Sequence, residues 1–279
     1  MRSGLGTIGV AAAAFWAASP VSAASLKVDY GISLAGLPIG TAGMASAFDG
    51  SRYNLQLQAK LTGLAGALTG GKGAATATGS FSGAQPLPAS FAVTSRSNRD
   101  QRTVRMGLAS GNVVALDITP PLDEKPDRVP LKDAHKRGII DPVSALVMPV
   151  QGRGNPLDAA NCNRTIPVFD GAARFDIVLS YAETRNVDKP GYNGPVLVCQ
   201  ARYVPIAGHR SERPATKFMQ ENRDMSVWLA PVAGTRVLVP LRISVRTMVG
   251  ISVIEALNWS VDSTAKVVPT SSGSAAELD

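Results

Sequence analysis

The sequence has few of the residues on which metal and redox chemistry depend. It contains two cysteines and two histidines. His135 and His209 stand at no metal-binding spacing, and Cys162 and Cys199 lack the C-x-x-C spacing of a redox pair. The G-x-S-x-G elbow of serine hydrolases is also missing. We therefore expect no metal and no other cofactor, and no catalytic residue is indicated, although an acid/base pair of carboxylates cannot be recognised from sequence alone.

Aromatic residues and clustered charges are scarce as well. Phe, Trp and Tyr make up 5% of the chain, and the basic residues are scattered. Nucleic acid is therefore not an expected partner. The formal net charge is +7, and removal of an N-terminal leader that contains Arg2 would reduce it to about +6. Outside the cytoplasm, a modest basic surplus favours anionic envelope partners such as phospholipid, lipopolysaccharide or acidic cell-wall polymer.

The long apolar run of the chain lies at its N-terminus. Arg2 precedes an apolar stretch over residues 8–18, and Val21-Ser22-Ala23 fits the small-x-small pattern of a signal-peptidase site. The run is shorter than the ~20 residues that a membrane-spanning helix needs. We predict a signal peptide over residues 1–23, a mature protein without a transmembrane segment, and a periplasmic location.

The two cysteines fit this compartment. An exported protein with an even number of cysteines most simply forms a disulfide, here Cys162–Cys199. The bond would close a loop of about 37 residues, which the chain-entropy model values at roughly 4 kcal/mol.

Alternating apolar and polar residues, separated by Gly, Pro, Asn or Ser, predict strands along most of the chain. The Asp49-Gly50 pair between two such runs indicates a tight hairpin. The predicted strands cover residues 26–34, 41–48, 53–61, 74–82, 89–96, 102–109, 112–118, 165–169, 173–183, 196–205, 225–231, 236–247 and 250–261. Their spacing indicates an antiparallel meander.

The other segments set the boundaries of this β region. Prolines prevent a regular element over residues 120–130. Asp141-Pro142 is typical of a helix start and predicts one short helix over residues 142–148. We predict a single β domain over residues 24–261. The tail over residues 262–279 has little to bury and is expected to be disordered.

Two surface features are candidate binding elements. Residues 63–73 match part of a phosphate-binding loop, but Gly73 stands where that motif needs Ser or Thr, so a flexible loop is the better interpretation. Its apolar residues, Leu64 and Leu68 among them, are suited to contact with a lipid or a partner. A hairpin around residue 99 carries a candidate anionic-ligand patch, although strand residues three apart face opposite ways. The patch residues are Arg96, Arg99, Arg102 and Arg105.

Several motifs, taken in order, resemble those of the exported bacterial domain-of-unknown-function family 3108. They are Gly36-Leu37-Pro38-Ile39-Gly40, Ile140-Asp141-Pro142-Val143-Ser144-Ala145-Leu146, Val168-Phe169-Asp170-Gly171 before Arg174, Cys199-x-x-Arg202-Tyr203-x-Pro205-Ile206-Ala207-Gly208, and Val227-Trp228-Leu229. The resemblance spans residues 26–260 and implies a periplasmic envelope protein of Gram-negative bacteria with a strongly curved antiparallel β structure. More distantly, the chain is similar to β-spiral envelope-integrity proteins and half-barrel lipoprotein carriers. No site residue carries over from either.

The fold class that we predict is all-β: a strongly curved antiparallel sheet or incompletely closed β-barrel with one short helix. Such a sheet can hold a hydrophobic ligand on its concave face. The leading hypothesis is a non-enzymatic periplasmic protein that binds a lipid, a lipoprotein or an envelope polymer and supports envelope integrity. The alternatives are a carboxylate-dependent enzyme acting on envelope polymer and a scaffold subunit that pairs through an exposed strand edge. Neither the ligand nor the oligomeric state is indicated by the sequence.

Overall fold

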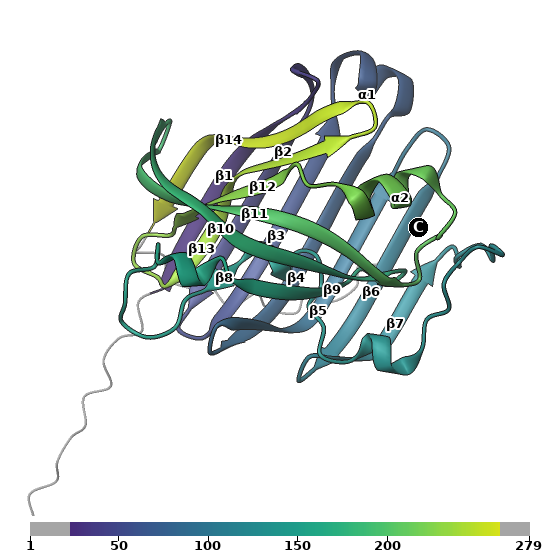
Figure 1. The fold of residues 1–279 in the computed structure, drawn as a ribbon, viewed down its shortest axis with the longest axis horizontal. Coiled ribbons are helices and arrows are strands. Elements are labelled where there is room, and N and C mark those ends of the chain that lie inside the picture. Colours follow the sequence, from purple (N-terminus) through teal and green to yellow (C-terminus); the bar gives the residue numbers. More distant parts are fainter. Residues whose placement is uncertain (1–22, 263–279) are drawn as a thin grey trace, which may run out of the picture.

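Antiparallel pairing joins the strands of this protein into one sheet that curves back on itself without closing. The computed structural model describes residues 23–262, so most of the predicted leader (1–22) and most of the predicted tail (263–279) lie outside the described residues. The sheet has 14 strands in the order β7-β6-β5-β4-β3-β2-β1-β14-β13-β12-β11-β10-β9, and β8 pairs with β13 outside this path. The predicted fold class, an incompletely closed antiparallel β structure, is confirmed (Figure 1).

The first seven strands form a regular meander. Their bounds are β1 Ala23–Leu34, β2 Leu37–Asp49, β3 Arg52–Leu61, β4 Lys72–Ser82, β5 Gln85–Arg96, β6 Gln101–Ala109 and β7 Asn112–Thr119. The predicted Asp49-Gly50 hairpin is present, because Asp49 pairs with Arg52 and Gly50 has a φ of 56°. Burial alternates along most of these strands, although not along the edge strand β7. In β3, for instance, Tyr53 and Leu55 are buried while Asn54 is exposed.

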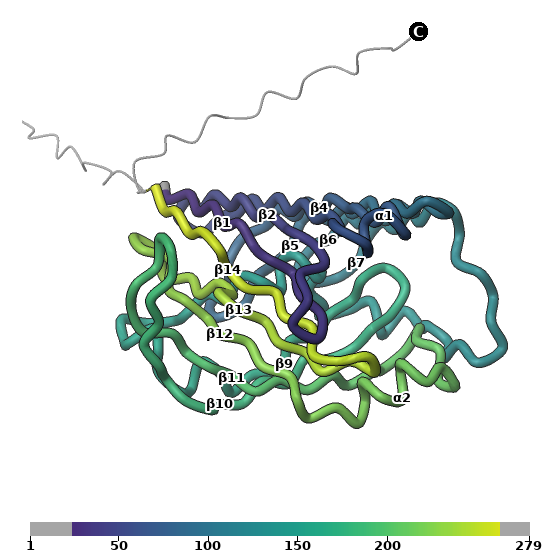
Figure 2. Tube along the Cα trace, turned by 90° about the horizontal axis from the view of Figure 1, so that it is seen from above, coloured from purple at the N-terminus to yellow at the C-terminus, as the bar shows by residue number. Residues whose placement is uncertain are grey.

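The remaining strands follow a long connection. They are β8 Met148–Pro149, β9 Arg164–Phe169, β10 Arg174–Lys189, β11 Tyr192–Ala207, β12 Met225–Pro231, β13 Val237–Thr247 and β14 Gly250–Asp262. Strand β14 pairs with β1 from Ser252 opposite Leu34 to Asp262 opposite Ser25, and so connects the two groups of strands. Figure 2 shows β1–β7 along one side of the molecule and β9–β13 along the other.

Two buried apolar clusters fill the space between and beside these layers. The larger cluster joins residues of β1–β6, such as Leu55 and Phe91, to Val239 of β13 and to Val143 and Val147 of the connection before β8. The smaller cluster surrounds the cysteines and includes these buried side chains of β8 and β10–β13: Met148, Leu179, Leu197, Met225, Leu229 and Leu238. The connection over residues 139–148 therefore contributes to both clusters.

The helical segments differ from the prediction. Asp141 caps the expected turn, since its Oδ1 accepts hydrogen bonds from the N–H groups of Val143 and Ser144 at 2.9 Å each. The helix predicted over residues 142–148 is nevertheless wrong in extent, because only a 3-10 turn over Ser144–Leu146 forms. From Met148 onward the chain forms strand β8, which pairs with β13 and therefore cannot continue a helix.

Two α-helices occur where none was predicted. Helix α1 (Gly63–Thr69) lies within the segment expected to be a loop, and it ends at Gly70, whose φ of 59° stops helical hydrogen bonding. Helix α2 (Pro214–Glu221) begins with proline at its first turn, a position where the missing N–H has no cost. Met219 of α2 packs against the smaller cluster, so tertiary contact stabilises a helix too short to form alone.

Candidate functional site

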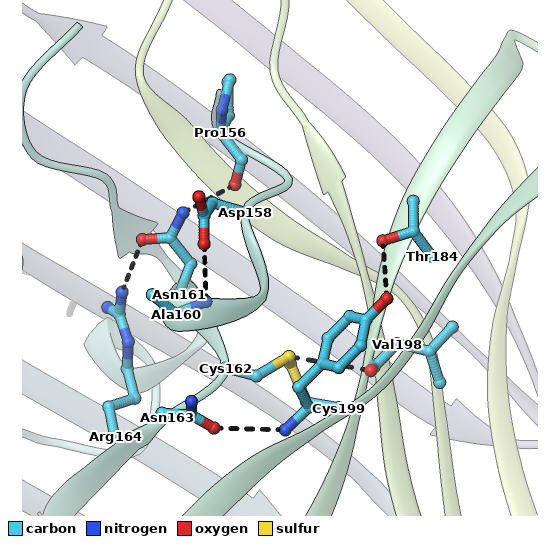
Figure 3. The surroundings of a disulfide bond; sticks show 11 residues. Pro156, Asp158, Ala160, Asn161, Cys162, Asn163, Arg164, Thr184, Val198 and Cys199 are labelled. Atoms are coloured by element: carbon cyan, nitrogen blue, oxygen red, sulfur yellow. Dashed lines mark hydrogen bonds between the residues drawn. A yellow bond between two sulfur atoms is a disulfide. The ribbon is translucent and has the colours of Figure 1, made fainter. Parts of the chain in front are cut away.

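A disulfide anchors the segment that lines the candidate site. Cys162 and Cys199 are bonded, as predicted, with their Cα atoms 5.5 Å apart, and both residues are fully buried. Cys199 lies in β11, whereas Cys162 lies in the loop just before β9 (Figure 3). The bond therefore attaches this loop to β11, which lies two strands away from β9 in the sheet.

Hydrogen bonds within the loop hold its shape. Asp158 accepts a hydrogen bond from the N–H of Ala160 at 2.8 Å and so caps a 3-10 turn over Ala159–Asn161. The side-chain amide of Asn161 donates to the carbonyl of Pro156 at 2.9 Å. Figure 3 shows these contacts beside the disulfide, with the Arg164 side chain directed toward Asn161. The disulfide and these hydrogen bonds together fix the position of the residues at the start of β9.

Arg164 is a cation without a counter-ion. Its guanidinium donates to the carbonyl of Ala84 at 3.2 Å and to Oδ1 of Asn161 at 3.5 Å. Within residues 23–262, no carboxylate lies within ion-pair distance of it. Burial lowers the pKa of Arg164, but arginine stays protonated in proteins. A half-buried guanidinium with unused N–H donors is a favourable partner for a carboxylate or phosphate group.

A cavity of about 300 Å³ opens beside Arg164. Its lining contains both polar and apolar residues. It is lined by Ala84, Gln85 and Pro86 of the β4–β5 connection, by Ile140, Ala145, Val147, Met148 and Gln151, and by Ala160, Asn161, Asn163, Arg164, Thr165, Ile166 and Pro167.

A second cavity, of about 220 Å³, adjoins the first. Its lining is almost wholly apolar and comes from residues 142–148 and strands β9–β13: Pro142, Ala145, Leu146, Met148, Ile166, Val168, Phe175, Ile177, Leu179, Ala201, Met225, Ser226, Val227, Leu229, Pro240, Ile243, Ser244 and Val245. Ala145, Met148 and Ile166 line both cavities, so the two spaces meet across these three residues.

Strand β9 connects the two cavities. Residues at every second position of a strand share a face, which places Arg164, Ile166 and Val168 in one row. Arg164 lines the first cavity, Ile166 lines both, and Val168 lines the second. The row measures about 13 Å at 3.3 Å per residue. It runs from a cation to an apolar pocket, which matches the polarity of a molecule with an anionic head and a hydrocarbon chain.

The structure separates the four arginines of the predicted patch. Arg96 and Arg105 belong to the same face of the sheet, Arg102 belongs to the opposite face, and Arg99 lies in the turn between β5 and β6. Arg105 is paired with Asp117 at 3.5 Å. Arg96 instead lies directly opposite Lys72, which in turn lies opposite Lys60, and neither lysine was singled out from the sequence.

Neither histidine lines one of these cavities. Nδ1 of His135 accepts a hydrogen bond from the backbone N–H of Lys132 at 3.1 Å, so this imidazole closes a short 3-10 turn. His209 follows β11, and burial lowers its pKa. Within residues 23–262, no three His, Cys, Asp or Glu side chains are placed to hold a metal ion.

Asp141 is fully buried and Asp170 is partly buried, and both carboxyl groups cap turns. Burial raises the pKa of both Asp141 and Asp170. Each accepts hydrogen bonds from two backbone N–H groups of the turn that follows it. Neither residue lines the cavities beside the disulfide, and no carboxylate at all lines those two cavities. The enzyme alternative required two carboxylates in one open cleft, and this pair of cavities does not provide them.

Sequence reasoning missed Arg164 and the apolar row that follows it. A signal was present: an arginine stands two positions after a cysteine, at the head of the alternating run Arg164–Phe169. The sequence did not predict that this run lies next to residues 142–148, because the contact depends on a parallel bridge between Ile140 and Val168.

These observations define a class of protein: an antiparallel β structure, curved but not closed, with an apolar cavity and a cationic mouth. The chain belongs to the family described as protein of unknown function (DUF3108), whose family model matches residues 26–256. The family resemblance predicted from the motifs is thus confirmed.

A comparison with solved structures finds a beta-barrel-like protein of domain of unknown function DUF1849 from Brucella abortus. The match has a TM-score of 0.47 and 9% sequence identity, and it covers 88% of this chain and 100% of the other. No curated protein matches the sequence. No helix within residues 23–262 has the length and hydropathy needed to cross a bilayer.

Proposed function

We propose that this protein is a non-enzymatic periplasmic envelope protein that binds an anionic amphiphile in the cavities beside the disulfide and thereby supports envelope integrity. The observation that carries the proposal is the row Arg164–Ile166–Val168, which leads from an unpaired guanidinium into an apolar pocket. The disulfide supports the location, because such bonds persist in oxidising compartments outside the cytoplasm.

The sizes and chemistry of the cavities agree with such a ligand. Ligand pockets usually measure ~300–1,000 Å³, and the two adjoining cavities together fall in this range. Each methylene removed from water contributes about 0.8 kcal/mol to binding, so a short hydrocarbon segment in the apolar cavity is worth several kcal/mol. The head group would accept hydrogen bonds from Arg164, which has no competing carboxylate.

The test is a titration of delipidated protein with a single-chain fatty acid, in which isothermal titration calorimetry measures the binding. Arg164→Gln removes the cation and keeps hydrogen-bonding ability. We expect it to weaken binding tenfold to roughly 100-fold, since a hydrogen bond to a charged group contributes about 1.5–3 kcal/mol. Ala145→Leu fills space shared by the two cavities and should weaken binding of long chains more than short ones. Arg153→Gln, at an exposed position in the preceding loop, is the charge-matched control.

Three results would contradict the proposal. One is a protein that binds no fatty acid and yields no amphiphile when extracted with organic solvent. Another is equal affinity of Arg164→Gln and Arg153→Gln variants for the ligand. The third is equal affinity for the fatty acid and for an uncharged alcohol of the same chain length, because the guanidinium should prefer the anion.

A second candidate function, a scaffold subunit, is favoured by the edge strand β7. This strand pairs with β6 and, within the described residues, has no partner strand on its other side. Val114 near its centre is 68% exposed. An unpaired edge of this kind can add a strand from another protein. Crosslinking through a cysteine at position 114 should recover a stoichiometric partner if this is the function.

A further inference from the structure

Exposed apolar side chains gather at one end of the sheet. We call this the α1 end: the β1–β2 turn (35–36), the β3–β4 connection with α1 (62–71), the β5–β6 turn (97–100) and the β13–β14 turn (248–249). Antiparallel order brings these connections to the same end. Figure 1 shows the first two and the β13–β14 turn at the upper edge of the molecule. The exposed apolar residues at or next to these connections are Leu37, Leu64, Leu68, Met248, Val249 and Ile251.

Backbone hydrogen bonds join the connections of this rim in two pairs. The N–H of Ala35 donates to the carbonyl of Ile251 at 2.9 Å, which holds the β1–β2 turn against the start of β14. The N–H of Asn98 donates to the carbonyl of Thr69 at 2.8 Å, which holds the β5–β6 turn against the end of α1. Leu64 and Leu68 are four residues apart on α1 and therefore project from the same side, 76% and 71% exposed.

A row of basic residues lies immediately below this rim. Lys60 is directly opposite Lys72, and Lys72 is directly opposite Arg96, on the neighbouring strands β3, β4 and β5. All three side chains are exposed and line a shallow groove of about 780 Å³. None of them forms an ion pair with a described residue. Like charges directly opposite each other destabilise a sheet, so an anionic surface placed over the row would reduce the electrostatic repulsion among these three side chains.

We propose that the α1 end docks on the surface of an anionic phospholipid bilayer, with the leucines of α1 inserted among the lipids and the basic row at the level of the head groups. Lys60 and Lys72 stand four residues before Leu64 and four after Leu68, so their long side chains reach phosphates while the leucines enter the apolar layer. This inference is independent of the proposed function, because it uses neither Arg164 nor the cavities beside it.

Vesicle flotation of the purified protein tests the docking. The probes are vesicles of phosphatidylcholine alone and of phosphatidylcholine mixed with phosphatidylglycerol. We expect binding to the mixed vesicles only, and its loss when ionic strength rises from about 0.1 M to about 1 M and screening becomes strong. The triple change Lys60→Gln, Lys72→Gln and Arg96→Gln should weaken binding roughly 100-fold, at about fivefold per charge. Leu64→Ser with Leu68→Ser should weaken it at least tenfold.

Matched controls separate docking from general effects. Lys132→Gln, Arg137→Gln and Arg153→Gln remove the same charge at exposed positions outside the α1 end and should bind vesicles as the unmodified protein does. Val114→Ser with Leu116→Ser, on β7, is the control for the leucines. Arg164→Gln should also leave vesicle binding unchanged, so failure of docking and failure of the proposed function give different results.

The proposal is overturned if both kinds of vesicle bind equally, if neither binds, or if the charge controls lose as much binding as the basic-row variant. It is also overturned if the α1 end pairs two copies of the chain. In that case light scattering would show a dimer that Leu64→Ser with Leu68→Ser converts to monomer. A circular dichroism spectrum equal to that of the unmodified protein, and a urea midpoint that is not lower, confirm that each variant is folded.

Discussion

Reduction of the Cys162–Cys199 bond should destabilise this protein by a measurable and calculable amount. The bond closes a loop with a sequence separation of 37 residues, so the chain-entropy model gives about 4 kcal/mol of lost stability. Reduction keeps both sulfur atoms in the smaller cluster, and the packing there is therefore largely unchanged. With a urea dependence of about 2–3 kcal/mol per M, the unfolding midpoint should fall by ~1.5 M.

The assay is equilibrium unfolding in urea, followed by the fluorescence of Trp228 and Trp259, with and without reductant. The double change Cys162→Ala and Cys199→Ala should lower the midpoint without reductant by at least as much, because it also removes two buried sulfur atoms. Because the bond also fixes the loop that leads to Arg164, reduced protein should bind a fatty acid more weakly than oxidised protein. An unchanged midpoint would refute the reasoning. A lower midpoint with unchanged affinity for the fatty acid would show that the disulfide stabilises the fold but does not shape the cavity.

Three further substitutions probe the fold. Burial raises the pKa of Asp141, so above about pH 4 the folded state keeps a proton that the unfolded state has lost, and the free energy of unfolding falls as pH rises toward the raised pKa. Asp141→Asn should remove this contribution, which urea unfolding of both proteins at about pH 4 and about pH 8 measures. Gly191→Ala should cost more than 2 kcal/mol, because the Cβ would collide with the backbone of Trp259, whereas Gly36→Ala, with a similar φ and open space, should cost about 1–2 kcal/mol. Equal losses in thermal unfolding would contradict the packing of the β10–β11 hairpin on β14.

The sequence predicted the position of a strand correctly where the strand follows from the local alternation of apolar and polar residues. Alternation predicted residues 53–61 and 112–118, and the strands are Arg52–Leu61 and Asn112–Thr119. The β10–β11 hairpin is different, since its predicted strands stop at 183 and begin again at 196. No strand was predicted over the polar and glycine-containing residues between them. In the structure both strands continue to the turn, where Tyr192 contacts Trp259 with ring centroids 5.5 Å apart.

The candidate site shows the same division. The disulfide followed from two cysteines and an export signal, which are counts and positions in the chain. Arg164 did not follow, because its significance depends on Ala84, 80 residues away, and on cavities assembled from several strands. Likewise, Lys60 and Lys72 did not stand out in the sequence, and Arg96 was grouped with other arginines. These three residues form a row only through the register of β3, β4 and β5.

The pairing of β1 with β14 has a consequence for how the chain reaches its native state. Leu26 and Val28 are synthesised more than two hundred residues before their neighbours Val261 and Trp259. Until β14 emerges, one edge of β1 is open to pairing with other chains, and contacts of such long sequence separation form slowly. The pairing of β1 with β14 is therefore expected to be a late and slow step of folding. A holding chaperone that shields β1 should raise the yield of native protein.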